Sequence, residues 1–273
     1  MSQLVIRRLL IDLETPFERQ WCAGNAFRTA FFNALSMSFP FGEQFFIDAV
    51  RGAVPMLSED AQQQWQAEVR GFIGQEATHR RIHALFNSQL SRQGLEDHWT
   101  PRVTRRMKLL EDQDPRHALA ITAATEHFTA IFADWLLRHP QTLQGVEPRL
   151  RTMWMWHAAE ESEHKCTAFD LYRAVGGSEK WRRRWMRRVT TLFLSDLLRQ
   201  TVSNLRHEKQ LWKRSTWRDA WQTLMGRDGL LRSNVGAWRA YFRPEFHPSE
   251  QESTLAQQWL DANHGSYTPV GAN

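Results

Sequence analysis

The segment Trp154–Lys165, "WMWHAAEESEHK", decides the fold, because it sets three glutamates and two histidines among two tryptophans. An exposed helix face accepts the charges but gains nothing from the tryptophans, and an apolar core accepts the tryptophans but not unpaired carboxylates. On a helix, Glu161 and His164 lie three residues apart on one face, which also carries Trp154 and His157. The pattern therefore predicts a Glu-x-x-His pair on a buried helix face.

The same pair occurs earlier in the chain, and a lone glutamate precedes each copy. The stretch "FIGQEATHRRIHALF" places Glu76 and His79 on an apolar face, and Glu43 and Glu126 each lie on the apolar stripe of another predicted helix. The lone glutamate precedes its pair by 33 residues in the first half of the chain and by 35 in the second. The sequence thus predicts an internal repeat of two helical hairpins.

Helical periodicity predominates along the chain, and strand signals are scarce. Pro40 is expected to break the first helix, which then restarts near Gly42. The fold class is therefore all-α, with a four-helix bundle in residues 1–178. Residues 179–273 are expected to form a basic, Trp-rich helical extension that packs on the bundle and is not an independent domain. The four long helices are predicted at 16–37, 58–90, 115–137 and 147–175.

Such a bundle brings four carboxylates and two imidazoles to its centre, where an isolated ionised group is too costly to bury. Two divalent cations solve this problem, and helical bundles with di-iron or dimanganese sites use this order of ligands. His157 is expected as a seventh ligand or as a residue that orients a carboxylate, and His83 has the same option one turn after His79. The other six expected ligands are Glu43, Glu76, His79, Glu126, Glu161 and His164.

Several neighbouring residues are expected to have simpler roles. Glu160 and Glu163 fall outside the buried stripe, so they are predicted to be solvated or paired with arginines. His127 is expected on a helix surface, and Trp154 and Trp156 are expected to pack the flanks of the bundle.

Five motifs of this chain together resemble one bacterial family, described as predicted metal-dependent hydrolases, and the resemblance extends over roughly residues 20 to 250. The order of the ligands is similar to that of the ferritin-like dimetal-carboxylate superfamily. Both resemblances imply that the six residues above are metal ligands. The position of His157 is also similar to that of an extra histidine in di-iron N-oxygenases that oxidise arylamines. The motifs are "FPFGEQFF", "QEATHRRIH", "TEHFTAIFADWLL", "WHAAEESEHKCTAFDLY" and "YFRPEFHP".

The carboxylate-rich ligand set favours iron over manganese or zinc, because flexible carboxylates accommodate both iron oxidation states. The expected function is an O₂-activating di-iron enzyme that oxidises, oxygenates or desaturates an organic, lipid-like substrate with an external electron donor. Small residues beside Glu126, such as Ala123 and Thr129, leave room for that substrate. The alternatives are a metal-dependent hydrolase that uses a metal-bound hydroxide and a non-catalytic ferritin-like metal binder.

The net charge of +5 hides an uneven distribution, since residues 180–243 hold 16 Lys and Arg against 4 Asp and Glu. Interspersed tryptophans suit an anionic membrane surface. Packing on the bundle or pairing of two subunits would also use this segment. No nucleic-acid motif accompanies the charge, so nucleic acid is not expected as a partner.

Cys22 and Cys166 are too few for a disulfide framework and suit reduced thiols. The N-terminal apolar stretch is interrupted by arginines, and no apolar run reaches the length of a membrane span. The expected location is therefore the cytoplasm, with the inner face of the membrane as a peripheral site.

Overall fold

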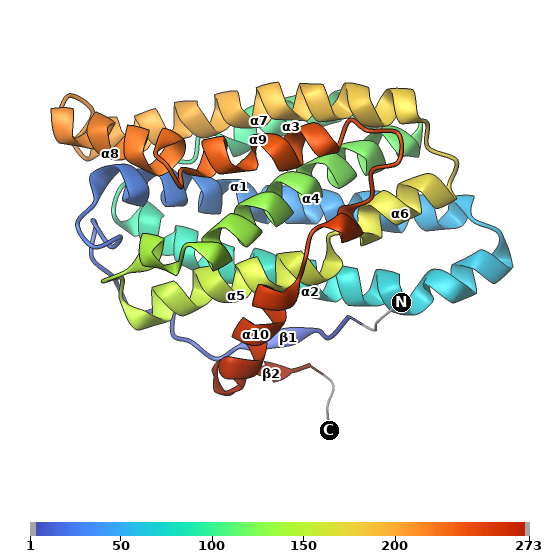
Figure 1. The fold of residues 1–273 in the computed structure, drawn as a ribbon, viewed down its shortest axis with the longest axis horizontal. Helices are drawn as coiled ribbons and strands as arrows, with labels where there is room; N and C mark the ends of the chain where they lie inside the picture. Colours follow the sequence, from blue (N-terminus) through green and yellow to red (C-terminus); the bar gives the residue numbers. More distant parts are fainter. Residues whose placement is uncertain (1–3, 271–273) are drawn as a thin grey trace.

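The computed structural model describes residues 4–270 and shows an all-α helical bundle, as predicted (Figure 1). Four long helices form its centre, and each contacts the next around a closed ring, in the order α1, α2, α5, α4. The two hairpins of the predicted repeat are therefore present as α1–α2 and α4–α5. The four helices are α1 (Ala26–Ala53), α2 (Glu59–Arg92), α4 (Pro115–Arg138) and α5 (Pro148–His164).

Shorter elements surround this ring. Two short strands pair antiparallel, with Arg8 opposite Thr268, and so join the two ends of the described chain. The strands are β1 (Arg7–Leu9) and β2 (Tyr267–Pro269). The remaining α-helices are α3 (Thr100–Met107), α6 (Thr167–Ala174), α7 (Glu179–His207), α8 (Arg214–Met225), α9 (Leu230–Ala240) and α10 (Thr254–Ala262). The 3-10 helices are Val54–Met56, Lys108–Leu110, Pro140–Leu143, Pro248–Glu250 and His264–Ser266.

The first predicted helix begins ten residues later than expected. Ala23 and Gly24 have positive φ angles of 49° and 72°, which no α-helix contains, and Asn25 then accepts a hydrogen bond from the backbone N–H of Arg28. Asn25 is thus the N-cap, and Pro16 lies in the preceding irregular segment. Proline also presets the φ angle that turns require, so Pro16, at the expected start of the helix, does not by itself mark a helix.

Pro40 does not break the first helix, contrary to the sequence-based expectation. It lies inside the continuous α1 helix, where its missing N–H leaves the carbonyl of Ser36 without its helical donor. The side-chain amide of Asn87, on α2, donates to that carbonyl at 2.8 Å. A neighbouring helix therefore satisfies the group that the proline leaves free.

The fourth predicted helix is divided into α5 and α6 by a turn at Lys165–Cys166. The ammonium of Lys165 donates to the carbonyl of Gln251 at 2.5 Å and to Ser253 Oγ at 2.7 Å, and Ser253 Oγ donates to the carbonyl of Ser162 at 3.3 Å. The segment before α10 thus supplies polar partners at the break, which lies directly after His164.

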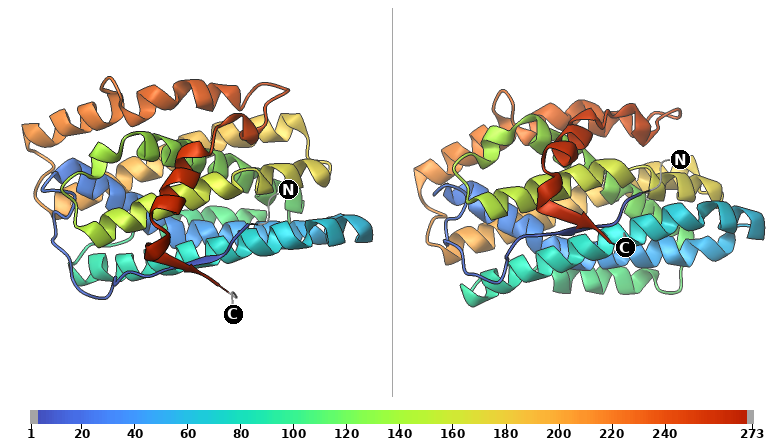
Figure 2. Two further views of the ribbon diagram at one scale, coloured as in Figure 1. Left: turned by 60° about the horizontal axis from the view of Figure 1, so that its bottom comes forward. Right: turned by 90° about the horizontal axis from the view of Figure 1, so that it is seen from below.

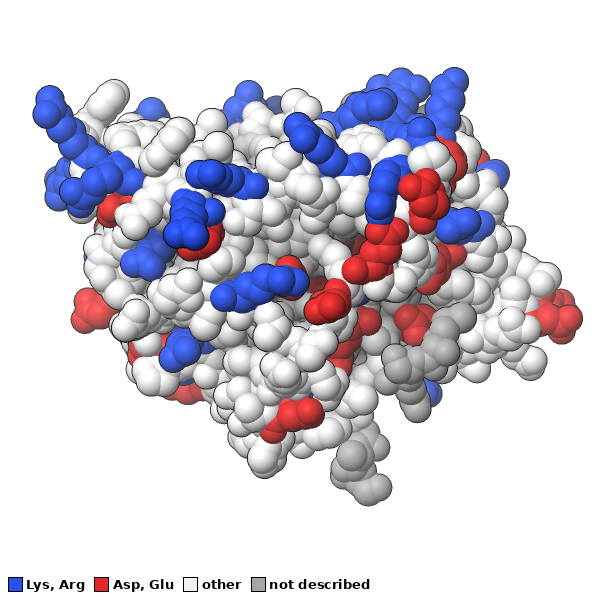
Figure 3. Space-filling model, viewed as in Figure 1, with Lys and Arg blue, Asp and Glu red and all other residues white. Residues whose placement is uncertain are grey.

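The C-terminal helices cover the ring. Helix α7 runs along α1 and α4, α9 packs on α4, and α10 crosses α5, as the three ribbon views show (Figure 2). The boundary proposed at residue 178 falls between α6 and α7. Lys and Arg gather along the edge formed by α7, α8 and α9 (Figure 3). Within residues 4–270, no helix is both long enough and apolar enough to span a membrane.

Candidate metal centre

The predicted ligands from four helices come together in the centre of the ring. Potential ligand atoms of Glu76, His79, Glu161 and His164 all lie within 4.8 Å of one another. Glu126 adjoins this group, because its Oε2 lies 3.4 Å from Nε2 of His164. A second group within the same 4.8 Å limit contains Glu43, His83 and His157. Each of these eight side chains is buried.

Nine potential ligand atoms in this cluster have no hydrogen-bond partner, and all are shielded from solvent. Every unpartnered buried carboxylate oxygen among residues 4–270 belongs to one of four glutamates that the sequence analysis selected. Buried polar atoms in native proteins are almost always partnered, so a cluster of nine needs an explanation. The atoms are both carboxylate oxygens of Glu43, Glu76 and Glu126, Oε2 of Glu161, Nδ1 of His79 and Nε2 of His164.

His164 presents one nitrogen to three carboxylates. Its Nδ1 lies 2.9 Å from Oε1 of Gln75, whose amide nitrogen donates to Glu163, so we assign the ring proton to Nδ1. Its Nε2 then lies 3.0 Å from Glu76 and 3.7 Å from Glu161, without the alignment of a hydrogen bond. A lone pair facing carboxylate oxygens requires a proton or a cation between them.

His79 is oriented in the same way, by a glutamate that sequence reasoning placed incorrectly. Glu160 is fully buried rather than outward-facing, and its Oε2 lies 2.9 Å from Nε2 of His79. Its other oxygen pairs with Arg7 at 3.0 Å, and Arg7 also pairs with Glu163 at 2.6 Å. Pairing with an arginine is confirmed for both glutamates, but solvation of Glu160 is wrong, because the N-terminal segment covers that face of α5.

The close approach of the N-terminal segment depends on glycines in α2. A Cβ atom on Gly74 would lie 2.2 Å from Cδ1 of Ile6, and one on Gly71 would lie 2.5 Å from Cβ of Leu4. Only glycine therefore allows the chain to pass so near α2. This contact brings Arg7 to the glutamates of α5.

His157 ends a chain of hydrogen bonds that starts at α1. Ser36 Oγ donates to Asn87 at 2.7 Å and so accepts from Nδ1 of His83 at 2.9 Å. Nε2 of His83 then accepts from Nδ1 of His157 at 2.6 Å. This order leaves Nε2 of His157 unprotonated, 3.0 Å from a carboxylate oxygen of Glu161.

The metal-free cluster retains protons on its carboxylates. Burial, followed by the charge of Glu76, raises the pKa of Glu43 well above its usual range. Burial and the charges of Glu76 and Glu161 raise the pKa of Glu126 to about 8. Burial alone would lower the pKa of His79, but the hydrogen-bonded carboxylate of Glu160 and the nearby carboxylate of Glu161 outweigh it and raise the pKa to about 10. The raised pKa values of the two glutamates show how poorly the buried site tolerates their negative charge without compensation.

Glu161 and His157 are shifted in the opposite direction. Burial alone would raise the pKa of Glu161, but the charge of His164 and the close approach of the His157 and His79 rings bring it well below its usual range. Burial and the charge of His79 lower the pKa of His157 to about 4. The cluster therefore offers a carboxylate and a neutral imidazole side by side, which are the protonation states that metals bind.

The structure confirms the role expected for Trp154 and Trp156 but not the one expected for His127. Trp154 and Trp156 pack in the core, as expected. His127 is buried rather than on the surface, because α9 covers this part of α4. Its Nε2 lies 3.1 Å from the carbonyl of Ala237, and its ring packs on Tyr241.

A helical bundle with a buried His and Glu cluster defines a candidate metal-binding protein, and its donor atoms fit a metal. The model of the family described as "predicted metal-dependent hydrolase" matches residues 5–252. The chain therefore belongs to this family, which indicates a metal-dependent enzyme. No curated protein and no solved structure matches the chain significantly.

Proposed function

We propose that this protein is a dinuclear metal-dependent hydrolase whose two metals lie in the centre of the α1–α2–α5–α4 ring. The observation that carries the proposal is the set of nine buried donor atoms without partners. Four carboxylates balance the +4 charge of two divalent cations, and buried carboxylates are otherwise too costly to keep ionised. The proposed ligands are Glu43, Glu76, His79, Glu126, His157, Glu161 and His164.

Surrounding side chains would hold the histidines in the orientation that a metal requires. Glu160, Gln75 and His83 each engage the outer nitrogen of one histidine, so that the inner nitrogen faces the glutamates. Both nitrogens of His83 are occupied, by Ser36 and His157, which favours an orienting role over a ligand role for this residue.

A pair of bound divalent metals would supply a Lewis acid and an activated water at neutral pH. The protein would supply the position of the bond to be cleaved and a dry environment. Phe39 packs at a tilt against His157 and His83, with ring centroids 4.6 and 4.5 Å apart, and Phe72 packs on His164 at 5.1 Å. These rings exclude bulk water and strengthen electrostatic interactions with a polarised substrate.

A second candidate function is oxidation of an organic substrate with O₂ at a di-iron site. The specific observation in its favour is an apolar cavity that reaches His157 and Glu161 and is otherwise lined largely by aromatic and aliphatic side chains. A carboxylate-dominated donor set also suits iron better than zinc. This reaction would need an external electron donor.

One experiment separates the two candidates. Protein purified without added metal is analysed for metal content and assayed with ester and phosphoester substrates. A second sample is loaded with Fe(II) without oxygen and then mixed with O₂. Two metals per chain with hydrolysis supports the first proposal, whereas transient visible absorption and fast iron oxidation support the second. Two bound metals with neither reaction would leave a non-catalytic metal binder.

A further inference from the structure

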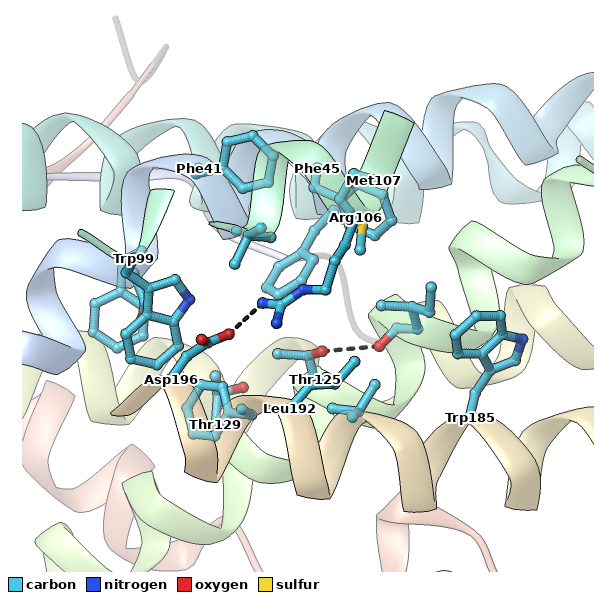
Figure 4. Close-up of a pocket in the computed structure, with 18 residues that line it drawn as sticks. Phe41, Phe45, Trp99, Arg106, Met107, Thr125, Thr129, Trp185, Leu192 and Asp196 are labelled. Atoms are coloured by element: carbon cyan, nitrogen blue, oxygen red, sulfur yellow. Dashed lines mark hydrogen bonds and ion pairs between the residues drawn. The ribbon is translucent and has the colours of Figure 1, made fainter. Parts of the chain in front are cut away.

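An apolar cavity of about 120 Å³ lies beside the proposed metal centre, between α1, α3, α4 and α7 (Figure 4). Apolar cavities of roughly this size, about 150 Å³, are known to stay dry and to bind benzene-sized molecules. The cavity includes Gly42 and Phe46, which flank Glu43 on α1, and Thr125 and Thr129, which flank Glu126 on α4. Its inner wall is therefore formed by the neighbours of two proposed ligands.

The cavity continues toward the other ligands. The smaller apolar cavity that reaches Glu161 and His157, about 50 Å³ in volume, shares Phe39, Thr129 and Phe193 with it. The two cavities therefore adjoin at these side chains, and a ligand that displaces them would find one apolar path that ends at the metal centre. An elongated apolar group would fit this path better than a compact polar one.

The outer end of the path carries positive charge. Figure 4 shows Arg106 directed into the cavity, where it pairs with Asp196. Arg102 pairs with the same carboxylate at 2.8 Å, so two cations share one anion, and Nε of Arg106 is buried without a partner. An anionic group bound here would neutralise the local excess of one positive charge and would accept a hydrogen bond from the free Nε–H of Arg106.

A basic groove adjoins this end of the cavity. The groove shares Arg106, Met107, Trp185 and Leu192 with the cavity, so these four side chains lie at the border between the two. It also contains three further arginines of α7, which are Arg184, Arg187 and Arg188. From the surface inward, the path is therefore lined first by cationic side chains and then by apolar ones, and it ends at the proposed metal centre.

We propose that this path binds a single-chain anionic amphiphile, with its head group at Arg106 and the α7 arginines and its alkyl chain directed toward the metal ligands. The inference rests on the proposed function only for the reaction at the inner end of the path. Hydrolysis would require an ester or amide bond there, and oxidation would require a C–H bond. Binding itself depends only on the cavity and the arginines, so it can be tested without turnover.

The test is displacement of a fluorescent fatty acid by a series of alkanoates, with metal-free and metal-loaded protein. Each methylene that enters the path should tighten binding about fourfold, until the path is full. Dodecanol should bind about ten- to hundredfold more weakly than laurate, because it cannot form charge-assisted hydrogen bonds with arginine. Equal affinity for short and long alkanoates would overturn the proposal.

Two variants, each with a matched control, locate the binding site. Gly42→Leu fills the cavity, since a Cβ atom there meets only Phe46 Cζ at 3.8 Å, and should weaken laurate binding more than tenfold. Gly52→Leu, an exposed position in the same helix with open space around it, should not. Arg106→Gln should weaken laurate binding but not dodecanol binding, and Arg218→Gln, whose side chain is 78% exposed on α8, should weaken neither.

The results also identify the source of the ligand. Co-sedimentation with phosphatidylglycerol vesicles that laurate competes away would assign a two-chain membrane lipid and overturn the single-chain ligand, whereas laurate binding without co-sedimentation would assign a free acid. If Gly42→Leu leaves laurate binding unchanged, the proposed binding path is wrong, even if the protein holds two metals. Conversely, a protein that binds laurate in this path but no metal would retain this inference and lose the proposed function.

Discussion

The carboxylate of Glu160 lies 2.9 Å from Nε2 of His79, and it is this contact that turns Nδ1 of His79 toward Glu161, 3.4 Å away. Arg7 holds Glu160 from the other side at 3.0 Å. The N-terminal segment is therefore connected to the proposed metal centre through Arg7 and Glu160, and also through Gln75, which donates to the carbonyl of Val5 and contacts His164. The same arrangement explains why a glutamate outside the Glu-x-x-His pattern is fully buried.

Glu160→Ala should weaken metal binding by about ten- to hundredfold, because His79 would lose the partner that fixes its ring orientation and raises its basicity. Metal affinity measured by competition with a chelator would test this. Glu163→Gln is the matched control, since it weakens the pairing with Arg7 but keeps an oxygen that accepts from the amide of Gln75, and Glu163 does not contact His79. Equal losses in the two variants would show that Glu160 acts only through Arg7 and the fold.

Asn87→Ala should destabilise the protein by about 1–3 kcal/mol, because it removes the donor to the carbonyl of Ser36. In a Pro40→Ala background the loss should be smaller, since the new backbone N–H at position 40 can donate to the same carbonyl. Chemical denaturation of the four proteins in this double-mutant cycle measures the coupling. If Asn87→Ala costs the same in both backgrounds, Asn87 does not compensate for the proline.

Stability of the metal-free protein should fall as pH rises above about 7, where His157, His83 and His127, whose pKa values are lowered, are neutral in both the folded and unfolded states. The folded-state pKa of Glu126 is raised from 4.5 to about 8, so its contribution is fully present below about pH 4.5 and is lost as pH rises through 8. The raised pKa values of Glu43 and His79 act in the same direction. Glu126→Gln should remove part of this dependence, on the order of a few kcal/mol.

Melting temperatures from about pH 7 to pH 9, with and without metal, would test this dependence. Metal-saturated protein should show little loss over this range, because bound carboxylates are ionised and neutralised by the cations. A metal-free protein that becomes more stable as pH rises would contradict the raised pKa values of the buried carboxylates.

The sequence predicts the ring of helices and the inward-facing pairs, because both depend on local spacing. Glu76 with His79, and Glu161 with His164, each share a helix face whatever surrounds the helix. The start of α2 is also local, since Ser58 accepts a hydrogen bond from the backbone N–H of Ala61.

The features that the sequence does not predict depend on distant partners. Pro40 remains helical only because Asn87 lies opposite Ser36, and Glu160 is buried only because Arg7 arrives from the N-terminal segment. His127 is covered by a helix about 110 residues further along the chain. A helix face that is polar in sequence can therefore be interior when another segment supplies the countercharge.

The most direct test of the dinuclear site is the metal stoichiometry of the wild-type protein and of Glu76→Ala and Glu161→Ala. Inductively coupled plasma mass spectrometry after extensive dialysis should give two metals per chain for the wild type and fewer than one for each variant. Circular dichroism of each variant would confirm that it is folded. Retention of two metals per chain in both variants would contradict the proposed site.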